Sequence, residues 1–374
     1  MESGRVALRV AKRLAILNAS SQSVFMPVSS VSSPLPPLFG KARRPLGWQG
    51  YTTQVPADWN PGKFGGTRAR GDLRVDDDLG VRFELRWETT AKTPDVEKSV
   101  ANFLQTLEKD AKKRKAAFRI VEGTHIVSRS RKRKEQVTSF GWIGEAKGEA
   151  SCGFGAAWYC PICKRVTFAH IVGQPNEKSA KVERLASEIL GPMECHGEGG
   201  WDSWSLFDIT IEIPSEFELG RAQILLNKIE MEWVRPRPLA LYGWGKRAER
   251  LKLWRFPAAT ALLADTSLEN WTLCNILEKH KQLRWKAIET SDAETAQKTK
   301  VNGHEKLAYR GILKDPRQQI PLWIFDKLMR RATPKPQLWA WDCPISNRIW
   351  ALEGEVSASN LHVPGEVLDS LHCH

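Results

Sequence analysis

Cysteine and histidine gather in two short segments near the middle of the chain. Cys160 and Cys163 form a Cys-x-x-Cys pair, and Cys195 and His196 follow as neighbours 32 residues after Cys163 (195 minus 163). Thiolate sulfur and imidazole nitrogen are the usual ligands of tetrahedral structural zinc. The spacing therefore predicts a structural zinc site made by these four residues. Adjacent side chains in a strand point to opposite faces, so Cys195 and His196 are expected on an irregular turn.

A related set of residues occurs at the end of the chain, in the same order. The segment Ala157–Arg165 is similar to Ala340–Arg348, and the closing pair returns as Cys373-His374. The offsets are 183 residues for the first match (343 minus 160) and 178 for the second (373 minus 195). Two collinear matches predict a tandem duplication, in which each copy closes with a cysteine-histidine pair.

The second set of metal ligands is incomplete. Cys343 matches Cys160, but Ser346 replaces the second cysteine of the pair. The candidates that are left are Cys343, Cys373 and His374, with His372 as a fourth ligand. The cofactor is unknown from the sequence; zinc is the candidate, and the first set is a stronger candidate site than the second.

Two other interpretations of the cysteines stay open. They could be buried core thiols, because free cysteine is among the most buried residue types. They could also serve a thiol-dependent enzyme around Cys160 and Cys163, with His170 or His196 as the base. The pair lies in a strand-like run rather than at a helix N-terminus, which disfavours a thioredoxin-type role. Since no phosphate-binding loop, nucleophile elbow or zinc-protease motif occurs, the sequence favours a non-catalytic protein.

The two matches set the domain organisation. We place repeat 1 at residues 47–206 and repeat 2 at residues 207–374, each long enough to bury its own core. Two further landmarks support the division. Pro56 with Trp87 is matched to Pro214 with Trp233, at spacings of 31 (87 minus 56) and 19 (233 minus 214). This comparison predicts about a dozen extra residues in repeat 1.

The elements inside each repeat predict an α+β fold. Alternating apolar residues from Val81 to Trp87 indicate a half-buried strand, and Ile209 to Ile213 repeat this pattern. Apolar residues at helical spacing predict helices over 96–111 and 182–190, and Gly191 ends the second. Strands on both sides of each helix favour an antiparallel sheet with helices packed on it.

The order of these elements resembles a known family. Each repeat begins with a strand that ends in Pro-x-x-Trp or Pro-x-x-Phe, at Pro56 and Pro214, and continues with a hairpin, a helix, more strands and a closing helix. This order resembles the PsbP-like fold over most of each repeat. The resemblance implies small α+β domains with an antiparallel sheet between helices, and it implies no shared activity or site residues.

The net charge of +13 is confined to two places. One is the N-terminal segment, and the other is residues 109–134, with eleven Lys or Arg against two acids. Such a run is either a solvated turn or a surface that contacts nucleic acid or another acidic partner. The candidate contacts in this run are Lys112, Lys113, Arg114, Lys115, Arg129, Arg131, Lys132, Arg133 and Lys134.

Residues 1–46 belong to neither repeat. Seven Lys or Arg, one acid and many serines and prolines indicate a disordered tail or an overextended start, with an organellar transit peptide as the alternative. No apolar run is long enough to span a membrane. Seven cysteines, an odd number, without a secretory signal favour reduced thiols and a cytoplasmic location.

The sequence thus predicts a non-catalytic binding or assembly protein on a duplicated α+β scaffold, with a structural zinc site in repeat 1. The first alternative is a nucleic-acid-associated protein that uses residues 109–134. The second alternative is a thiol-dependent enzyme around Cys160 and Cys163.

Overall fold

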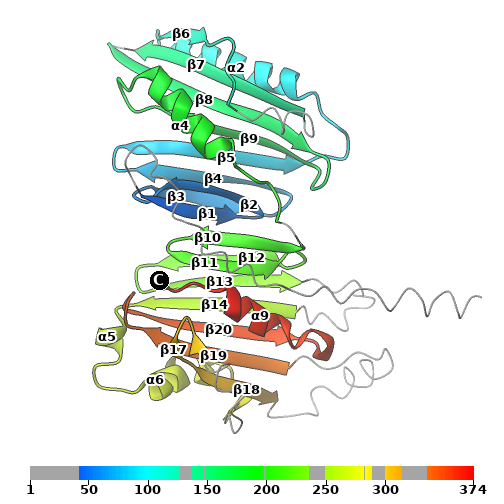
Figure 1. Ribbon diagram of the computed structural model, residues 1–374, viewed down its shortest axis with the longest axis vertical. Coiled ribbons are helices and arrows are strands. Elements are labelled where there is room, and N and C mark those ends of the chain that lie inside the picture. The colour runs from blue at the N-terminus through cyan, green and yellow to red at the C-terminus, as the bar shows by residue number, and fades with distance from the viewer. Residues whose placement is uncertain are drawn as a thin grey trace, which may run out of the picture. The chain divides into compact units, whose positions relative to one another are not determined.

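The computed structural model describes most of the chain after its N-terminal segment, and every described residue lies in the compact unit Pro37–His374. The described ranges are 42–126, 136–146, 148–197, 199–235, 249–281, 283–288, 300–313 and 335–374. Antiparallel strands dominate this part of the chain, and helices are few (Figure 1).

Residues from the first half form a seven-stranded antiparallel sheet. Its strands, in the order in which they pair, are β3 (Asn60–Gly66), β4 (Arg70–Asp77), β5 (Gly80–Thr89), β9 (Arg165–Val172), β8 (Glu149–Cys160), β7 (Gln136–Ala146) and β6 (Ala117–Ile120). Helix α2 (Val96–Lys113) follows β5 in the chain, and helix α4 (Ser179–Leu190) follows β9.

Residues from the second half form another seven-stranded sheet. Its strands, in pairing order, are β12 (Glu218–Leu225), β13 (Lys228–Arg235), β14 (Glu249–Pro257), β20 (Arg348–Val356), β19 (Lys335–Cys343), β18 (Leu307–Leu313) and β15 (Leu283–Ala287). The helical segments here are α5 (Ala259–Leu262), α6 (Leu268–Asn275), η2 (Leu277–Lys279), η5 (Ala358–Asn360) and α9 (Val363–Ser370).

The remaining strands form two smaller sheets. The four-stranded sheet has the order β11 (Ile209–Pro214), β10 (Trp201–Leu206), β1 (Arg43–Trp48) and β2 (Tyr51–Pro56). The two-stranded sheet is a hairpin of β16 (Lys300–Val301) and β17 (His304–Glu305). The four-stranded sheet thus combines one hairpin from each half of the chain.

The two seven-stranded sheets have the same strand order. In each sheet the first three strands in sequence order lie side by side from one edge. The third of them, β5 or β14, pairs with the strand that comes last in sequence order, β9 or β20. The register agrees too, because Cys160 pairs with Arg165 in β8–β9 and Cys343 pairs with Arg348 in β19–β20.

Two helices lie on opposite faces of the first sheet. Successive residues of β8 point to opposite faces, and Ala157 packs with Val100 of α2, whereas Trp158 packs in the cluster that contains Ile189 of α4. The predicted helices are confirmed as α2 and α4, and Gly191 caps the end of α4. The predicted strand from Val81 to Trp87 is confirmed as part of β5.

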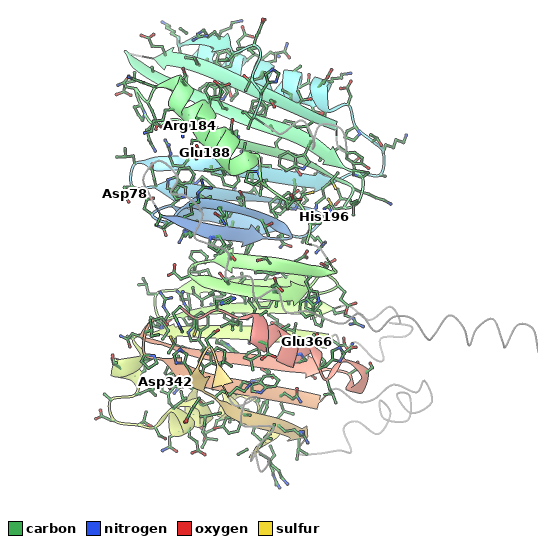
Figure 2. All side chains as sticks on the ribbon, in the orientation of Figure 1. Asp78, Arg184, Glu188, His196, Asp342 and Glu366 are labelled. Carbon is green, nitrogen blue, oxygen red and sulfur yellow. The ribbon has the colours of Figure 1, made fainter. Side chains whose placement is uncertain are left out.

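The exposed side of α4 carries polar residues, as expected of an amphipathic helix. Arg184 and Glu188 form an ion pair of 3.0 Å one helical turn apart (Figure 2). Glu188 also lies 3.7 Å from Arg43 at the start of β1. This helix therefore presents its apolar side to the sheet and its charged side to solvent.

The sheet order corrects one of the sequence landmarks. Trp87 lies on β5, the third strand from the edge, whereas Trp233 lies on β13, the second strand. The offset stays at 158 from the start of β2 (209 minus 51) to the start of β4 (228 minus 70), so the expected dozen extra residues in the first half are absent. The match was wrong because alternation with a closing tryptophan fits any half-buried strand and does not identify which one.

One predicted domain boundary falls inside a strand, and the other divides a hairpin at its turn. The tail was expected to reach residue 46, but Arg43 to Leu46 belong to β1. The expected division at 206/207 lies in the turn that joins β10 to β11, where Phe207 and Asp208 have positive φ. A division that keeps this hairpin whole lies before Trp201.

Tryptophan side chains connect the four-stranded sheet to the core. Trp204 contacts Trp48 edge-on, with ring centroids 5.2 Å apart, and Trp233 at 5.5 Å. All three are buried. Edge-to-face aromatic pairs contribute beyond the area they bury, by about 0.5–1.5 kcal/mol each. Trp204, near the middle of the chain, is thus a core residue.

One of the buried carboxyl groups of the second sheet has a raised pKa. Glu353 of β20 is 8% exposed, and its Oε2 lies 3.5 Å from Nε2 of His280. Burial, with help from the nearby Glu355, raises the pKa of Glu353 to about 8. Burial likewise lowers the pKa of His280. In both groups burial thus favours the neutral form, the protonated carboxyl of Glu353 and the unprotonated imidazole of His280.

This pair gives the first prediction. Because the folded state binds the proton of Glu353 more tightly than the unfolded state, stability is full below the unfolded pKa of about 4.5 and falls as pH rises through about 8. Glu353→Gln has a similar size, does not titrate and therefore removes this dependence. Between pH 6 and pH 9 we expect the wild type to lose about 1–3 kcal/mol of unfolding free energy relative to the variant, measured in urea. Glu278→Gln, at an exposed position, is the control. Parallel pH profiles of wild type and Glu353→Gln would contradict the assignment.

Candidate metal centre

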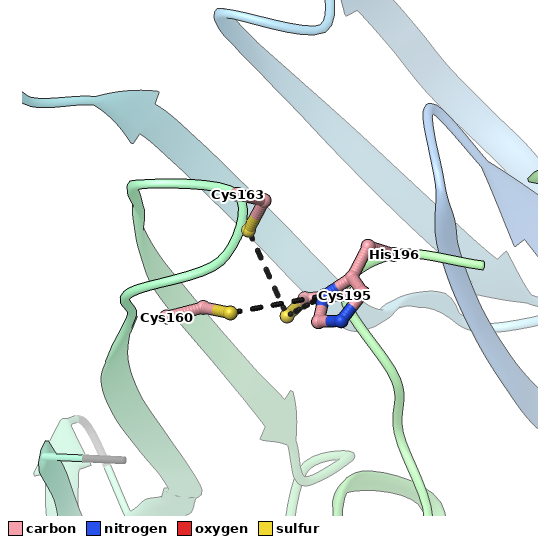
Figure 3. A group of neighbouring side chains, drawn as sticks. All are labelled: Cys160, Cys163, Cys195 and His196. Carbon is pink, nitrogen blue, oxygen red and sulfur yellow. Dashed lines mark hydrogen bonds between the residues drawn. The ribbon is translucent and has the colours of Figure 1, made fainter. Parts of the chain in front are cut away.

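The four residues of the first predicted metal set lie together. Cys160 is the last residue of β8, and Cys163 lies in the turn of residues 161–164 that leads into β9. Cys195 and His196 lie in the irregular segment after α4 (Figure 3). One ligand atom from each residue lies within 4.8 Å of all the others. The structure therefore brings together residues from two segments that the sequence separates by 32 positions (195 minus 163).

The distances between the donor atoms fit a tetrahedron around zinc. With Zn–S of about 2.3 Å and Zn–N of about 2.0 Å, two sulfurs lie about 3.8 Å apart and a sulfur and a nitrogen about 3.5 Å apart. Cys163 Sγ and Cys195 Sγ are 3.9 Å apart. His196 Nδ1 lies 3.3 Å from Cys195 Sγ and 3.7 Å from Cys160 Sγ. A disulfide would need about 2.05 Å, and these cysteines are free.

The local backbone explains how adjacent residues can share one ion. Residues 195–196 form a bend rather than a strand, so the side chains of Cys195 and His196 can both point toward Cys160. The preceding residue, Glu194, makes two backbone hydrogen bonds with Thr52 of β2, of 2.9 and 3.0 Å. These bonds fix the segment just before the ligands.

The three thiols affect each other's protonation. Hydrogen bonds from the thiols of Cys160 and Cys195 lower the pKa of Cys163, and the nearby positive charge of Arg165 adds to the effect. Hydrogen bonding to the neighbouring sulfurs and burial raise the pKa of Cys195. Cys160 and Cys195 are buried, whereas Cys163 is half-buried. The cluster thus stabilises a thiolate, which is the form that binds metal.

A buried arginine completes the site. Arg165 is 1% exposed and lies with its guanidinium 4.5 Å from the ring centroid of Tyr51. It donates to the backbone carbonyl of Gln49 at 2.8 Å and to that of Cys195. A zinc ion with three thiolates and one neutral imidazole carries a net charge of −1. Arg165 supplies the opposite charge next to it.

The second predicted set also converges, with a different fourth member. Cys343 ends β19, and Cys373 and His374 follow α9. The fourth residue is His304 of β17, and one ligand atom from each of the four lies within 4.8 Å of the others. The sequence suggested His372, which is exposed and is not in the cluster. His304 was missed because it lies outside both repeated blocks.

The other cysteines take no part in either cluster. Cys152 is buried in the core, and burial raises its pKa to about 11. Cys274 is exposed at the end of α6. His170, one of the expected bases for a thiol nucleophile, lies 3.2 Å from Glu84. Within the described residues the two clusters in the metal sets are therefore the places where thiols and imidazoles meet.

The structure describes residues 109–126 of the basic run 109–134. Lys112, Lys113, Arg114 and Lys115 are exposed at the end of α2. Two of them pair with acids of the same helix: Lys112 with Glu108 at 2.8 Å and Lys113 with Asp110 at 3.0 Å. The other expected contacts, Arg129 and Arg131 to Lys134, lie outside the described residues. The nucleic-acid interpretation therefore stays a prediction.

An open cleft of about 700 Å³ lies over β4 and β5, apart from the thiols. Its charged lining pairs internally, with Lys63 2.9 Å from Asp72 and Arg70 4.0 Å from Glu88. Neither a cysteine nor a histidine lines it. The cleft thus lacks the nucleophile and base that a thiol enzyme would need.

Comparisons with known proteins give no assignment: no family model matches the chain, and no curated protein is significantly similar to it. Among the helices that the structure describes, none is long and apolar enough to cross a membrane.

The buried arginine gives the second prediction. Arg165→Met removes the donors to two buried carbonyls and should lower the unfolding free energy by about 2–4 kcal/mol in denaturant titrations. Arg348→Met is the matched control, at the corresponding register position of β20. Arg348 pairs with Asp208 at 3.0 Å, and Asp208 is 59% exposed, so its loss should cost less than about 1 kcal/mol. Equal losses for the two variants would contradict the role of Arg165.

Proposed function

We propose that this protein is a non-catalytic binding or assembly scaffold made of two copies of one α+β domain, and that a structural zinc ion closes the first copy. The ligands of this ion are Cys160, Cys163, Cys195 and His196. The observation that carries the proposal is the convergence of their donor atoms at distances that fit tetrahedral zinc.

The sheet topology supports the duplication. The two seven-stranded sheets have the same strand order, and β1–β2 and β10–β11 precede them as matching hairpins. The isolated bridges agree as well, because Thr52–Glu194 in one half has the counterpart Thr210–His372 in the other. Under this proposal the copies are approximately 43–200 and 201–374. The PsbP-like resemblance is compatible with a sheet that has helices on both faces, and it stays a prediction.

The donor set favours a structural over a catalytic ion. All four coordination positions of a tetrahedral ion would be filled by protein atoms, whereas a catalytic zinc keeps one position for water or substrate. Two of the three thiols are fully buried, which also hinders their use as nucleophiles. Free cysteines throughout the described residues support a reducing compartment such as the cytoplasm.

The turn that carries the ligands supports a role in binding. Ile162, between Cys160 and Cys163, is 74% exposed, and Ile345, at the corresponding place after Cys343, is 71% exposed. Isoleucine is among the residue types most often fully buried, so two exposed tips at matching places are candidate contact points. A zinc ion below the turn would hold such a tip rigid. Rigid apolar tips suit contacts with a partner, because little side-chain entropy is lost on binding.

The third prediction tests the zinc site. Cys163→Ser removes one ligand, and the fold should tolerate it because Ser346 occupies the matching position in the second half. The purified variant should hold one zinc ion per chain fewer than the wild type, measured by elemental analysis. Its unfolding free energy should fall by roughly 3 kcal/mol or more, since the free energy of zinc binding adds to that of folding.

Cys274→Ser is the control for this experiment, because Cys274 is exposed and belongs to neither cluster. It should leave both zinc content and stability unchanged. Metal-free wild-type protein would leave the buried-thiol interpretation instead. Rapid alkylation of Cys163 in the metal-free protein would show a reactive thiolate and would favour the thiol-enzyme alternative.

A further inference from the structure

We propose that His304, Cys343, Cys373 and His374 form a second zinc site, of Cys2His2 type, and that its ion pins the hairpin β16–β17 to the segment after α9. This proposal goes beyond the first site and rests on different residues. Its fourth ligand comes from an element that neither repeated block contains.

The donor geometry supports a tetrahedral ion. Two imidazole nitrogens on zinc lie about 3.3 Å apart, and a nitrogen and a sulfur about 3.5 Å apart. His304 Nε2 and His374 Nδ1 are 3.4 Å apart. His374 Nδ1 lies 3.5 Å from Cys343 Sγ and 3.3 Å from Cys373 Sγ. His374 Nδ1 thus lies, from each of the three other donor atoms, at about the distance that separates two ligands of a tetrahedral zinc ion.

Hydrogen-bond donors point at both sulfurs. The backbone N–H of Ser346 donates to Cys343 Sγ at 3.5 Å. The side-chain amide of Asn302 donates to Cys373 Sγ at 3.5 Å and to the carbonyl of Leu371 at 2.6 Å. Donors of this kind stabilise thiolates and orient metal ligands. Each sulfur of the set thus accepts a hydrogen bond from a donor that is not itself one of the four candidate ligands.

The β16–β17 hairpin positions His304 next to the other three candidate ligands. Val301 of β16 is 3% exposed and packs in the main core, which anchors one strand. Asn302 and Gly303 both have positive φ, at 50° and 83°, and form the turn between β16 and β17. This turn brings the chain back beside the segment after α9. His304 then occupies the place of the ligand that Ser346 cannot supply.

Electrostatics distinguishes the two sites in the way their donor sets require. A zinc ion with two thiolates and two neutral imidazoles has no net charge, so it needs no buried cation. Arg165 is buried beside the Cys3His set, which would carry −1 with zinc bound. Arg348 holds the corresponding register position, and it turns to Asp208 at 3.0 Å instead. Arg165, at 1% exposure, is thus a buried cation beside the set with three thiols, whereas the Arg348 side chain beside the set with two thiols is 23% exposed.

The test is a metal count with matched histidine variants. Wild-type chain, purified without added zinc, should hold two zinc ions per chain. X-ray absorption should report an average shell of five sulfurs and three nitrogens for each pair of ions, as the two donor sets require. His304→Ala should hold one ion, with a shell of three sulfurs and one nitrogen. His372→Ala, which removes the exposed histidine beside Cys373, should retain both ions.

Hydrogen exchange gives a readout that does not depend on counting. Amides of residues 300–305 should exchange at least about tenfold faster in His304→Ala than in His372→Ala, because the hairpin loses its tether to the segment after α9. Circular dichroism of the two variants should agree, which shows that the sheet is intact.

The outcomes separate this proposal from the first zinc site. One ion in the wild type that is lost in Cys163→Ser and kept in His304→Ala would overturn the second site and leave the first intact. One ion that is lost in His304→Ala and kept in Cys163→Ser would overturn the first site and support the second. Loss of an ion from His372→Ala would show that the fourth ligand is the exposed histidine and would overturn the role of His304. A metal-free wild type would overturn both sites.

Discussion

The contact between the turn after β8 and the segment after α4 is the constraint on which the first half of the structure depends. Helix α4 packs against β8 and β9 through Val182, Leu185 and Ile189, and the chain that leaves it must cross to the end of β8. At that point the guanidinium of Arg165 donates a hydrogen bond to the backbone carbonyl of Cys195. Three thiols and an imidazole meet at this crossing. Without an ion, these side chains are joined by hydrogen bonds among themselves and from Arg165 to Cys163, and a hydrogen bond contributes only about 1 kcal/mol to stability.

The same contact brings the beginning and the end of each proposed copy together. Thr52 of β2 pairs with Glu194, one residue before the first closing ligand pair, and Thr210 of β11 pairs with His372, one residue before the second. A link between two residues that are distant in sequence closes a loop and lowers the entropy of the unfolded chain. The resulting gain in folding free energy rises slowly with the number of residues in the loop. In the first copy, zinc would close the loop between Cys163 and Cys195 and so hold the segment after α4 to the end of β8, next to the Thr52–Glu194 bridge.

The repeated blocks predicted most of the ligands but not the whole of either site. They identified Cys160, Cys163, Cys195 and His196 because two matching segments identify equivalent residues without any knowledge of the fold. The sequence could not identify His304, which has no counterpart in the matching blocks and reaches its cluster only through the hairpin turn at Gly303. The strand and helix patterns fixed local structure, as β5 and α2 show. They could not fix strand order, because period-two alternation is alike on neighbouring strands, and the Trp87 landmark failed for that reason.

The two clusters differ at one matched position. Ser346 stands in the second half where Cys163 stands in the first, so the second cluster has one thiol fewer. Its fourth donor is the imidazole of His304, and Arg348 pairs with Asp208 in the turn between β10 and β11. In the first cluster Arg165 is buried beside three thiols, and its guanidinium donates to the carbonyl of Gln49 in the turn between β1 and β2. The two arginines thus connect their sheets to matching turns, Gln49–Gly50 between β1 and β2 and Phe207–Asp208 between β10 and β11.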